Sequence, residues 1–444
     1  MMTIGMVVSD VIAILSSGLF AILLRRFVLG SFPLAIAGWI PATILVFIIV
    51  YAVRGYYPGI GMGIVEELRL LTTTTSLVFL TIGAVTYVGG VQVDFSRFSF
   101  LMTWVISLAA VPINRILFRH FLTKLSLWGE PVAIIGETKA ANRLARTFAM
   151  DAKIGLKPVF IGRNLKEFLD APISSSHPPR TAVVLYQRLD QLNLIRDTFR
   201  DTFERVILFS SEDEGLHLNG LRVRLFGNQL TFEITQTLLD PTAQFVKRVM
   251  DLSISTLGLL LLSPVFLLIA LMIRIDSKGP VLFRQQRIGK NGQPFGMLKF
   301  RTMYQNADAM LSQHLAANLE AKAEWDEYQK LTDDPRITRL GKLLRRFSID
   351  ELPQLWNVLL GEMSVVGPRP FMDNQAQIYG IKVYQYRRVR PGITGLWQIS
   401  GRNKKTFEQR TALDERYVLR WSVWLDIYII VRTVWVVLIQ DGAR

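Results

Sequence analysis

The sequence predicts a chain of three parts: an α-helical transmembrane bundle, a Rossmann-like α/β domain, and a mainly α membrane-associated domain with a re-entrant helix. Long apolar stretches crowd the first quarter of the 444 residues, and short apolar runs alternate with helical patterns in the segment that follows. Half of the residues are hydrophobic, and 51 Lys and Arg exceed 36 Asp and Glu, which gives a net charge of +15. These observations predict the fold class.

The composition also excludes several classes of protein and of functional site. The chain has no cysteine, which excludes disulfides, zinc–thiolate sites, iron–sulfur clusters and a cysteine nucleophile. So much apolar sequence excludes an intrinsically disordered chain. A membrane bordered by anionic lipid accounts for both the hydrophobicity and the charge, whereas nucleic acid accounts for the charge alone. We therefore expect membrane lipids, and no nucleic acid, as partners.

Residues 1–125 are expected to form a bundle of four transmembrane helices. Each apolar stretch approaches the roughly 20 residues that a helix needs to cross the hydrocarbon core. The first is not a cleavable signal peptide, because no basic segment precedes it and further spans follow at once. The run of Thr and Ser at 72–76 dilutes the third, but these hydroxyls can bond back to the helix backbone. The four stretches are Val7–Leu24, Phe32–Val53, Leu68–Val88 and Phe98–Leu117.

The positive-inside rule favours cytoplasmic ends for this bundle. With the N-terminus inside, the cytoplasmic flanks hold five basic residues and the outer loops hold three. The five are Arg54, Arg69, Arg115, Arg119 and Lys124, and the three are Arg25, Arg26 and Arg97.

Residues 126–235 are expected to form the Rossmann-like domain. Val132–Gly136 has the pattern of a buried strand entering a turn, followed by a helix through Phe148. Further apolar runs at 157–161, 181–185 and 205–209 predict a small parallel sheet with right-handed crossovers. The turn contains Gly136 alone, where a dinucleotide site needs G-x-G-x-x-G, so a regulatory or architectural role is favoured over nucleotide binding.

Residues 236–444 are expected to form the third domain, with a re-entrant membrane helix at 247–275. Proline removes a helix hydrogen bond, so Ser263 and Pro264 predict a break in the middle of this helix. Basic residues flank it on both sides, and a full crossing would place one cluster outside. An ordinary kinked span stays the alternative. Residues 421–439 suit either an interfacial helix or a buried core helix.

The densest polar cluster of the chain holds five cations between Arg336 and Arg346, followed by Asp350 and Glu351. A capping box beginning at Ser348 would place Pro353 inside the helix, where it deletes a hydrogen bond. With Asp350 as the cap, Pro353 falls in the first turn, where proline is tolerated. This second interpretation puts two carboxylates at a helix N-terminus beside Arg345.

Such an arrangement is suited to phosphate. The carboxylates would repel it unless a divalent cation intervenes, and Mg²⁺ uses few protein ligands. Adjacent helical residues project about 100° apart, so one carboxylate can face the phosphorus while the other holds the metal. Arg369 between two prolines suits bidentate phosphate binding, and Lys299 and Arg301 follow a glycine-punctuated turn. Solvated surface cations are the alternative for any one of these.

A series of short motifs runs through the third domain. They are Ser263-Pro264, Gly279-Pro280-Val281, Lys299-Phe300-Arg301, Asp334-Pro335-Arg336-Ile337-Thr338, Asp350-Glu351-Leu352-Pro353-Gln354-Leu355, Val366-Gly367-Pro368-Arg369-Pro370 and Pro391-Gly392-Ile393-Thr394-Gly395-Leu396-Trp397. With these motifs the chain from about Lys247 to Gly442 resembles the bacterial sugar transferases, which are polyisoprenyl-phosphate hexose-1-phosphate transferases. The four spans and the α/β segment resemble the large membrane form of this family, which includes undecaprenyl-phosphate galactose and glucose phosphotransferases. Ala323-Glu324-Trp325 looks more like the galactose-phosphate members.

The resemblance implies that Asp350 attacks the sugar-linked phosphorus of a UDP-hexose, UDP-galactose or UDP-glucose. UMP leaves, and undecaprenyl phosphate then takes the sugar phosphate from the aspartyl intermediate. Glu351 would hold Mg²⁺. The implied phosphate-binding residues are Arg345, Arg369, Lys299, Arg301 and Arg336.

The resemblance also implies the first membrane step of exopolysaccharide, O-antigen or capsule synthesis, at the cytoplasmic face of the bacterial inner membrane. Ile349, Phe347 and Thr302 depart from the usual family residues, but none removes a reactive group.

Three other functions are weighed against this one. A membrane-anchored nucleotide-sugar dehydratase needs the glycine-rich turn that Gly136 does not supply. A conventional glycosyltransferase would release UDP. A non-catalytic polysaccharide-assembly protein would not need Asp350 and Glu351 intact. The hexose, the ligand of the α/β domain and a homodimer stay open, since no motif addresses them.

Overall fold

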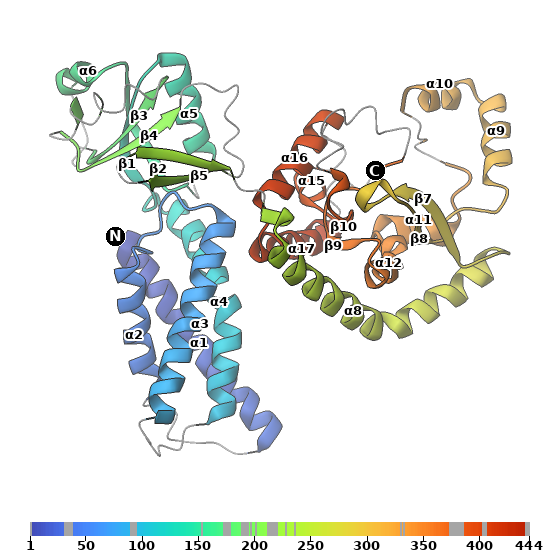
Figure 1. Ribbon diagram of the computed structural model, residues 1–444, viewed down its shortest axis with the longest axis horizontal. Coiled ribbons are helices and arrows are strands. Elements are labelled where there is room, and N and C mark those ends of the chain that lie inside the picture. Colours follow the sequence, from blue (N-terminus) through green and yellow to red (C-terminus); the bar gives the residue numbers. More distant parts are fainter. Residues whose placement is uncertain are drawn as a thin grey trace. The chain divides into compact units, whose positions relative to one another are not determined.

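The structure of the chain is a computed structural model (Figure 1). The chain divides into two compact units, Met1–His217 and Leu218–Arg444. The predicted boundaries at 125/126 and 235/236 stay predictions. The described residues are 2–30, 39–88, 96–151, 154–171, 179–187, 195, 198–199, 202–210, 221–226, 229–234, 237–328, 331, 334–372, 386–401 and 406–439.

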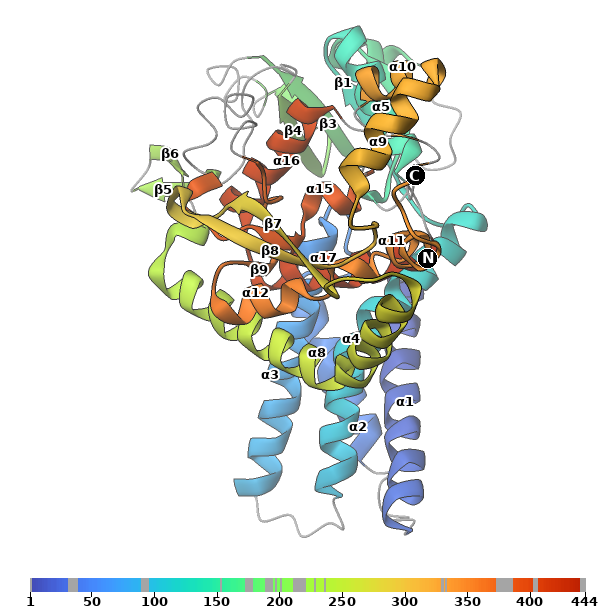
Figure 2. The same cartoon turned by 90° about the vertical axis from the view of Figure 1, so that its right-hand side faces the viewer.

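Four apolar helices run side by side in the first unit (Figure 2). They are α1 (Met2–Leu29), α2 (Trp39–Val53), α3 (Ile64–Val88) and α4 (Arg97–Lys124). Helices α1, α3 and α4 are long and apolar enough to cross a membrane, whereas α2 is shorter. The start of the predicted second span, residues 32–38, lies outside the described residues. The four predicted stretches are otherwise confirmed as apolar helices.

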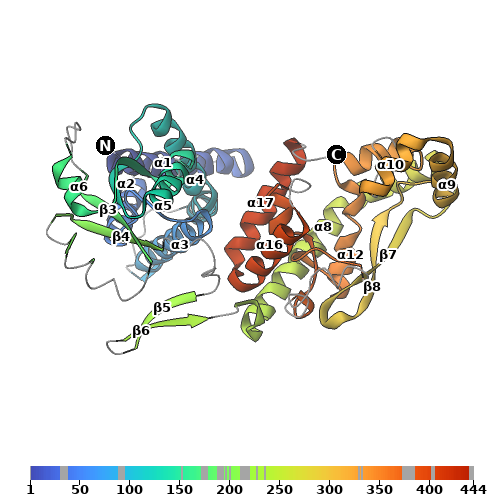
Figure 3. The same ribbon diagram turned by 90° about the horizontal axis from the view of Figure 1, so that it is seen from above.

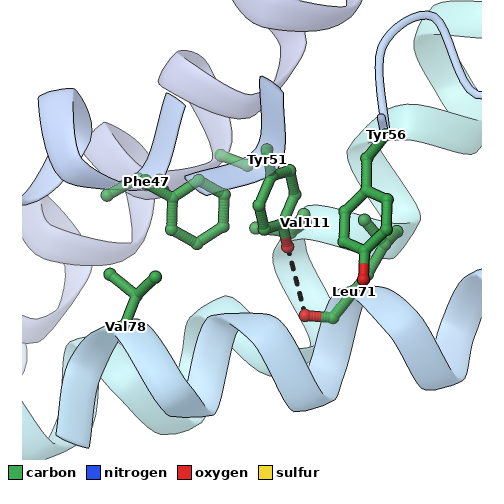
Figure 4. Close-up of a cluster of buried hydrophobic side chains, with 8 residues drawn as sticks. Phe47, Tyr51, Tyr56, Leu71, Val78 and Val111 are labelled. Carbon is green, nitrogen blue, oxygen red and sulfur yellow. Dashed lines mark hydrogen bonds between the residues drawn. The ribbon is translucent and has the colours of Figure 1, made fainter. Parts of the chain in front are cut away.

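The threonine run does not interrupt α3. The hydroxyls of Thr72, Thr73 and Thr75 donate to carbonyls four residues earlier, each at 2.7 Å. Behind them, Tyr51 of α2 donates to the Leu71 carbonyl and packs with Phe47, Val78 and Val111 in the bundle core (Figure 4).

A buried set of four charged side chains, the bundle ion cluster, joins three of these helices. Arg115 of α4 donates to both carboxylate oxygens of Asp10 on α1, at 2.8 and 2.6 Å. Arg119, one turn further on, makes a bidentate ion pair with Glu67 of α3. Every charge in this cluster is paired, as buried charges require.

A four-stranded sheet completes the first unit. The strands β1 (Glu130–Ile135), β2 (Leu156–Gly162), β3 (Thr181–Tyr186) and β4 (Arg205–Ser210) pair in parallel in the order β2-β1-β3-β4. Helix α5 (Thr138–Met150) follows β1, and α6 (Leu165–Asp170) follows β2. The predicted parallel sheet is confirmed. Gly136 has φ +154°, and a Cβ there would lie 2.5 Å from the Cβ of Leu185. Close backbone approach therefore accounts for this glycine.

The second unit begins with a two-stranded ribbon, β5 (Leu221–Phe226) and β6 (Gln229–Ile234), seen from above in Figure 3. A short 3₁₀ turn, η4 (Thr237–Leu239), leads into α8 (Pro241–Asp276). Helix α8 has 36 residues and meets the length and hydropathy of a membrane span.

The predicted break in α8 is wrong as an interruption of the helix, because Ser263 and Pro264 lie inside one continuous helix. Pro264 has no N–H to donate to the Leu260 carbonyl. The hydroxyl of Ser263 donates to that carbonyl instead, at 2.8 Å. The helix therefore continues through the proline and curves along its length (Figure 1).

Buried polar contacts fasten the first turns of α8 to the C-terminal helices. The Lys247 ammonium lies 3.0 Å from Asp251 and 2.8 Å from Asp426 of α17 (Val423–Ile439). Asp426 also accepts from Tyr417 of α16 (Phe407–Arg420), at 2.8 Å. One face of α17 packs inward through Ile429, while apolar side chains such as Trp435 stay exposed on the other. Helix α17 thus combines the features of the two predicted alternatives.

The remaining helices and strands of this unit lie between α8 and α16 in the sequence. They are β7 (Leu282–Ile288), η5 (Lys290–Gly292), β8 (Pro294–Phe300), α9 (Ala307–Ala317), α10 (Leu319–Tyr328), α11 (Arg339–Arg346), η6 (Ile349–Glu351), α12 (Gln354–Leu360), β9 (Ser364–Val366), β10 (Gly392–Thr394) and α15 (Leu396–Ile399). Strands β7 and β8 form an antiparallel hairpin. The second half of α8 packs through Ile269 and Ile273 on Phe300 of β8 and Leu344 of α11, with Ile349 beside them. This core supports the residue that precedes Asp350.

Candidate active site

Asp350 and Glu351 lie in the 3₁₀ turn η6, which precedes α12. Ser348 adopts the left-handed conformation (φ 54°) and makes no side-chain capping bond, so the capping box is wrong. Asp350 does not cap the helix either, because α12 begins at Gln354 with Pro353 before it. The tight turn holds the two carboxylates ahead of the helix rather than in its first turn.

Helix α12 is fixed to the β7–β8 hairpin by Asn357. Its side-chain oxygen accepts from the Leu298 N–H at 3.0 Å, and its amide donates to the Gly296 carbonyl at 2.9 Å. Arg248 of α8 donates to the carbonyls of Val358 and Leu359 at the other end of α12. The turn that bears the carboxylates is thereby held against β8.

Asp350 is a buried carboxylic acid with an altered acidity. Burial raises its pKa to about 6, and the neighbouring Glu351 charge adds to the rise. The cations Lys299 and Arg345 act in the opposite direction. Among the described residues, no ion pair engages Asp350. With this pKa the carboxylate is mostly ionised at neutral pH.

Glu351 is more accessible and is engaged by a cation from β8. The Lys299 ammonium lies 2.8 Å from its carboxylate, and both side chains are partly exposed. Two residues that the sequence predicts for the site are thereby brought into contact, although they lie 52 positions apart.

Arg345 lies in the last turn of α11, close to Asp350. Its Nε donates to the Thr302 hydroxyl at 2.9 Å, and burial lowers its pKa while the charges of Asp350 and Asp334 raise it. Gly341 lets α11 lie close to the chain after β8, since a Cβ there would be 2.2 Å from the Thr302 carbonyl oxygen. The structure thus brings Arg345, Lys299 and Asp350 together.

Two predicted phosphate-binding residues make contacts within the protein. Arg336 forms a bidentate pair with Asp334, at 2.8 and 2.7 Å, and lies over the Trp325 ring. Arg301 donates to the backbone carbonyl and the hydroxyl of Ser277 just after α8, at 2.6 and 2.8 Å. These contacts brace the site; a phosphate-binding role for either residue stays a prediction.

Arg369 lies in a loop that packs on a second loop of the predicted site. The Gly367 N–H donates to the Thr394 carbonyl, and the Gly392 N–H to the Pro368 carbonyl. A Cβ on Gly392 would lie 2.0 Å from the Gly367 nitrogen. Close contact between the two loops therefore accounts for these glycines. The exposed Arg369 guanidinium lies over the Trp397 ring, 4.9 Å from its centre.

The sequence alone missed two buried groups beside this loop. Asp414 of α16 is buried, which raises its pKa well above the usual range, while the backbone N–H and the charge of Arg369 oppose the rise. Its position on the buried face with Thr411 and Tyr417 was the available signal. Arg287 of β7 is also buried, whereas Arg284 of the same strand is exposed, and the sequence does not distinguish the two.

The carboxylates of the site bear on whether it could hold Mg²⁺. Among the described residues no cluster of three His, Asp or Glu side chains is placed to hold a metal. Glu351 presents an accessible carboxylate next to Asp350, and Mg²⁺ is commonly bound by one or two carboxylates together with substrate phosphates. The residues therefore fit Mg²⁺ held jointly with a substrate.

Comparison with known proteins identifies a family model and several related sequences. The family model described as "Bacterial sugar transferase" matches residues 242–440. The UDP-galactose-lipid carrier transferase of Erwinia amylovora is 33% identical over 374 residues, 79% of this chain and 77% of the relative. A UDP-glucose:undecaprenyl-phosphate glucose-1-phosphate transferase of Klebsiella pneumoniae is 30% identical over 423 residues, 86% and 84% of the two chains. The exopolysaccharide production protein ExoY of Sinorhizobium fredii is 44% identical over 205 residues, 46% of this chain and 91% of the relative.

Proposed function

Because the chain belongs to the bacterial sugar transferase family, a family of enzymes, we propose that it transfers a hexose 1-phosphate from a UDP-hexose to undecaprenyl phosphate. The names of the Erwinia amylovora and Klebsiella pneumoniae relatives specify UDP-galactose and UDP-glucose, and these two donors are the first candidates. One observation carries the chemistry: Asp350 is a buried carboxylate with no ion-pair partner among the described residues, next to Lys299 and Arg345.

In the first step, an oxygen of ionised Asp350 attacks the phosphorus that bears the hexose. The bond from that phosphorus to the bridging oxygen breaks, and UMP leaves with the electron pair. A carboxylate nucleophile divides one difficult displacement into two easier ones. The pKa of about 6 leaves Asp350 ionised at neutral pH while burial keeps water from solvating it.

In the second step, a phosphate oxygen of undecaprenyl phosphate attacks the same phosphorus. The bond to Asp350 breaks, which restores the carboxylate and forms the diphosphate-linked sugar. Arg345 and Arg369 would stabilise the negative charge that develops on the transferring phosphoryl group. Mg²⁺, held by Glu351 and substrate oxygens, would neutralise charge on the diphosphate.

We place this reaction at the cytoplasmic face of the bacterial inner membrane, as the first membrane step of exopolysaccharide, O-antigen or capsule synthesis. The curved helix α8 would enter the cytoplasmic leaflet and return, with the middle of the helix at the deepest point. Its basic flanks and the apolar side chains exposed along it support this placement. Division into parts at 1–125, 126–235 and 236–444 belongs to the same proposal.

The nucleotide that is released tests this function. The purified full-length chain is incubated with undecaprenyl phosphate, Mg²⁺ and either UDP-galactose or UDP-glucose, and the nucleotide is identified by chromatography. UMP is expected. Release of UDP would refute phosphosugar transfer, and no release from a panel of UDP-sugars would favour a non-catalytic assembly protein.

A further inference from the structure

Arg287 is a buried cation without a counterion among the described residues. It lies on β7, and only 8% of the residue is exposed. Its Nη2 donates to the neutral Gln285 side chain at 3.1 Å, and its Nε has no hydrogen-bond partner. No ion pair of the described residues includes Arg287. Arg336, in contrast, donates to both carboxylate oxygens of Asp334.

Burying a guanidinium in this way costs free energy, because water that solvated the charge is replaced by groups that do not balance it. A neutral amide supplies one acceptor and no negative charge. The fork of N–H groups on arginine matches the oxygens of a phosphate, so an anionic ligand would satisfy both the charge and the free donor.

The surroundings of Arg287 belong to the candidate active site. The next residue, Ile288, donates its N–H to the Phe371 carbonyl at 3.0 Å, which ties β7 to the chain just after Arg369. Arg287 lies within electrostatic range of both Arg369 and Glu351. Burial lowers the pKa of Arg287, and the charge of Arg369 lowers it further, as is expected when two cations face one region.

We propose that Arg287 binds a phosphate group of a substrate together with Arg369. The assignment rests on the proposed function, which supplies two phosphorylated substrates. The hairpin register pairs Lys299 with Phe283, and Arg287 lies four residues further along β7, about 14 Å at the usual rise of a strand. This end of the hairpin also lies beside α8, because Lys290 donates to Gln244 in the first turn of that helix at 3.1 Å. The phosphate of the nucleotide is taken as the expected ligand, and the test below separates it from the phosphate of the lipid.

The test compares Arg287→Gln with Arg284→Gln in the full-length protein. Arg284 lies on the same strand with its side chain exposed on the opposite face, so it controls for the loss of one positive charge. Binding of radiolabelled UMP is measured by equilibrium dialysis, and KM is measured for UDP-galactose and for undecaprenyl phosphate. Arg287→Gln is expected to weaken UMP binding and raise the KM for UDP-galactose about 10- to 100-fold, whereas Arg284→Gln leaves both unchanged.

The two sources of phosphate give different results. A raised KM for undecaprenyl phosphate with unchanged UMP binding would assign Arg287 to the lipid phosphate. The melting temperature of the unliganded protein should not fall in Arg287→Gln, because the variant removes an unbalanced charge. Arg287→Lys, which keeps the charge, should recover part of the affinity.

The proposal is overturned if UMP binding and both KM values of Arg287→Gln match the wild type, whether or not the melting temperature changes. UMP binding needs no turnover, so it remains measurable in a wild-type protein that transfers no sugar. Failure of the proposed function and failure of this assignment are therefore distinguishable.

Discussion

The bundle ion cluster and the candidate active site are both rich in charged side chains, but only in the cluster do the charges balance. In the cluster, Arg115 and Arg119 each meet a carboxylate, so two cations balance two anions. In the site, cations outnumber carboxylates, and Asp350 has no ion-pair partner among the described residues. The cations of the site are Arg287, Lys299, Arg345 and Arg369, and its carboxylates are Asp350 and Glu351.

This difference distinguishes charged residues that stabilise the fold from charged residues that would bind a ligand. A balanced buried network gains little from any further ion, and breaking it leaves an unpaired charge. An unbalanced site carries a free-energy cost that a substrate with the opposite charge relieves. We therefore expect substitutions in the cluster to change stability and substitutions in the site to change turnover.

The largest expected effect is that of Asp350→Asn on turnover. The amide is a poor nucleophile, so UMP release should fall at least about a thousandfold. The matched control is Asp308→Asn, which makes the same change at an exposed position of α9 and should retain wild-type turnover. Wild-type UMP release by Asp350→Asn would remove Asp350 from the nucleophile role.

Substitution in the bundle ion cluster should act on stability instead. Arg115→Met leaves Asp10 buried and unpaired and should cost about 3–5 kcal/mol in the free energy of unfolding. Replacing both partners, with Asp10→Leu added, should recover most of that loss. The measurement is denaturant or thermal unfolding in detergent, with UMP release per folded molecule held near wild type. A single variant as stable as the wild type would contradict the role of the cluster.

A smaller effect is expected on stability: Asp350→Asn should be more stable than the wild type at pH 8. The pKa of Asp350 is about 6 in the folded chain, against an ordinary value of 3.8. Protonated Asp350 therefore favours folding, and this contribution is complete below pH 3.8 and lost as the pH rises through about 6. At pH 8 the ionised carboxylate costs about 3 kcal/mol, which asparagine avoids.

Without substrate or Mg²⁺, Asp350→Asn should thus unfold at a higher temperature than the wild type at pH 8, and the two should converge near pH 4. In the wild type, the first step should slow as the pH falls through about 6, because the nucleophile becomes protonated. A variant less stable than the wild type at pH 8 would show that burial does not raise the pKa of this carboxyl.

Much of the fold follows from local sequence patterns. The parallel strands were predictable because runs such as Val132–Ile135 are continuously apolar, as buried parallel strands are. The continuity of α8 was not, because the Ser263 hydroxyl takes over the carbonyl that Pro264 leaves free. The turn η6 was missed because Ser348 adopts a left-handed conformation, which its residue type does not signal.

The candidate site, too, could be predicted only in part from the sequence. Asp350, Glu351, Arg345 and Lys299 were found through their motifs, and the structure brings them together. Arg287 was not found, because only the folded structure shows that it is buried without a counterion among the described residues. Pairing of this kind depends on contacts between distant segments, such as that of Ile288 with Phe371.

The most direct test of the account is the covalent state of Asp350 during the reaction. The full-length enzyme is mixed with UDP-galactose or UDP-glucose and Mg²⁺ without undecaprenyl phosphate, quenched, and examined by intact and peptide mass spectrometry. We predict a mass increase of one hexose phosphate on the peptide that contains Asp350, removed on addition of undecaprenyl phosphate and absent in Asp350→Asn. Transfer to undecaprenyl phosphate with UMP release, but with no adduct at Asp350 under any quench condition, would contradict the account.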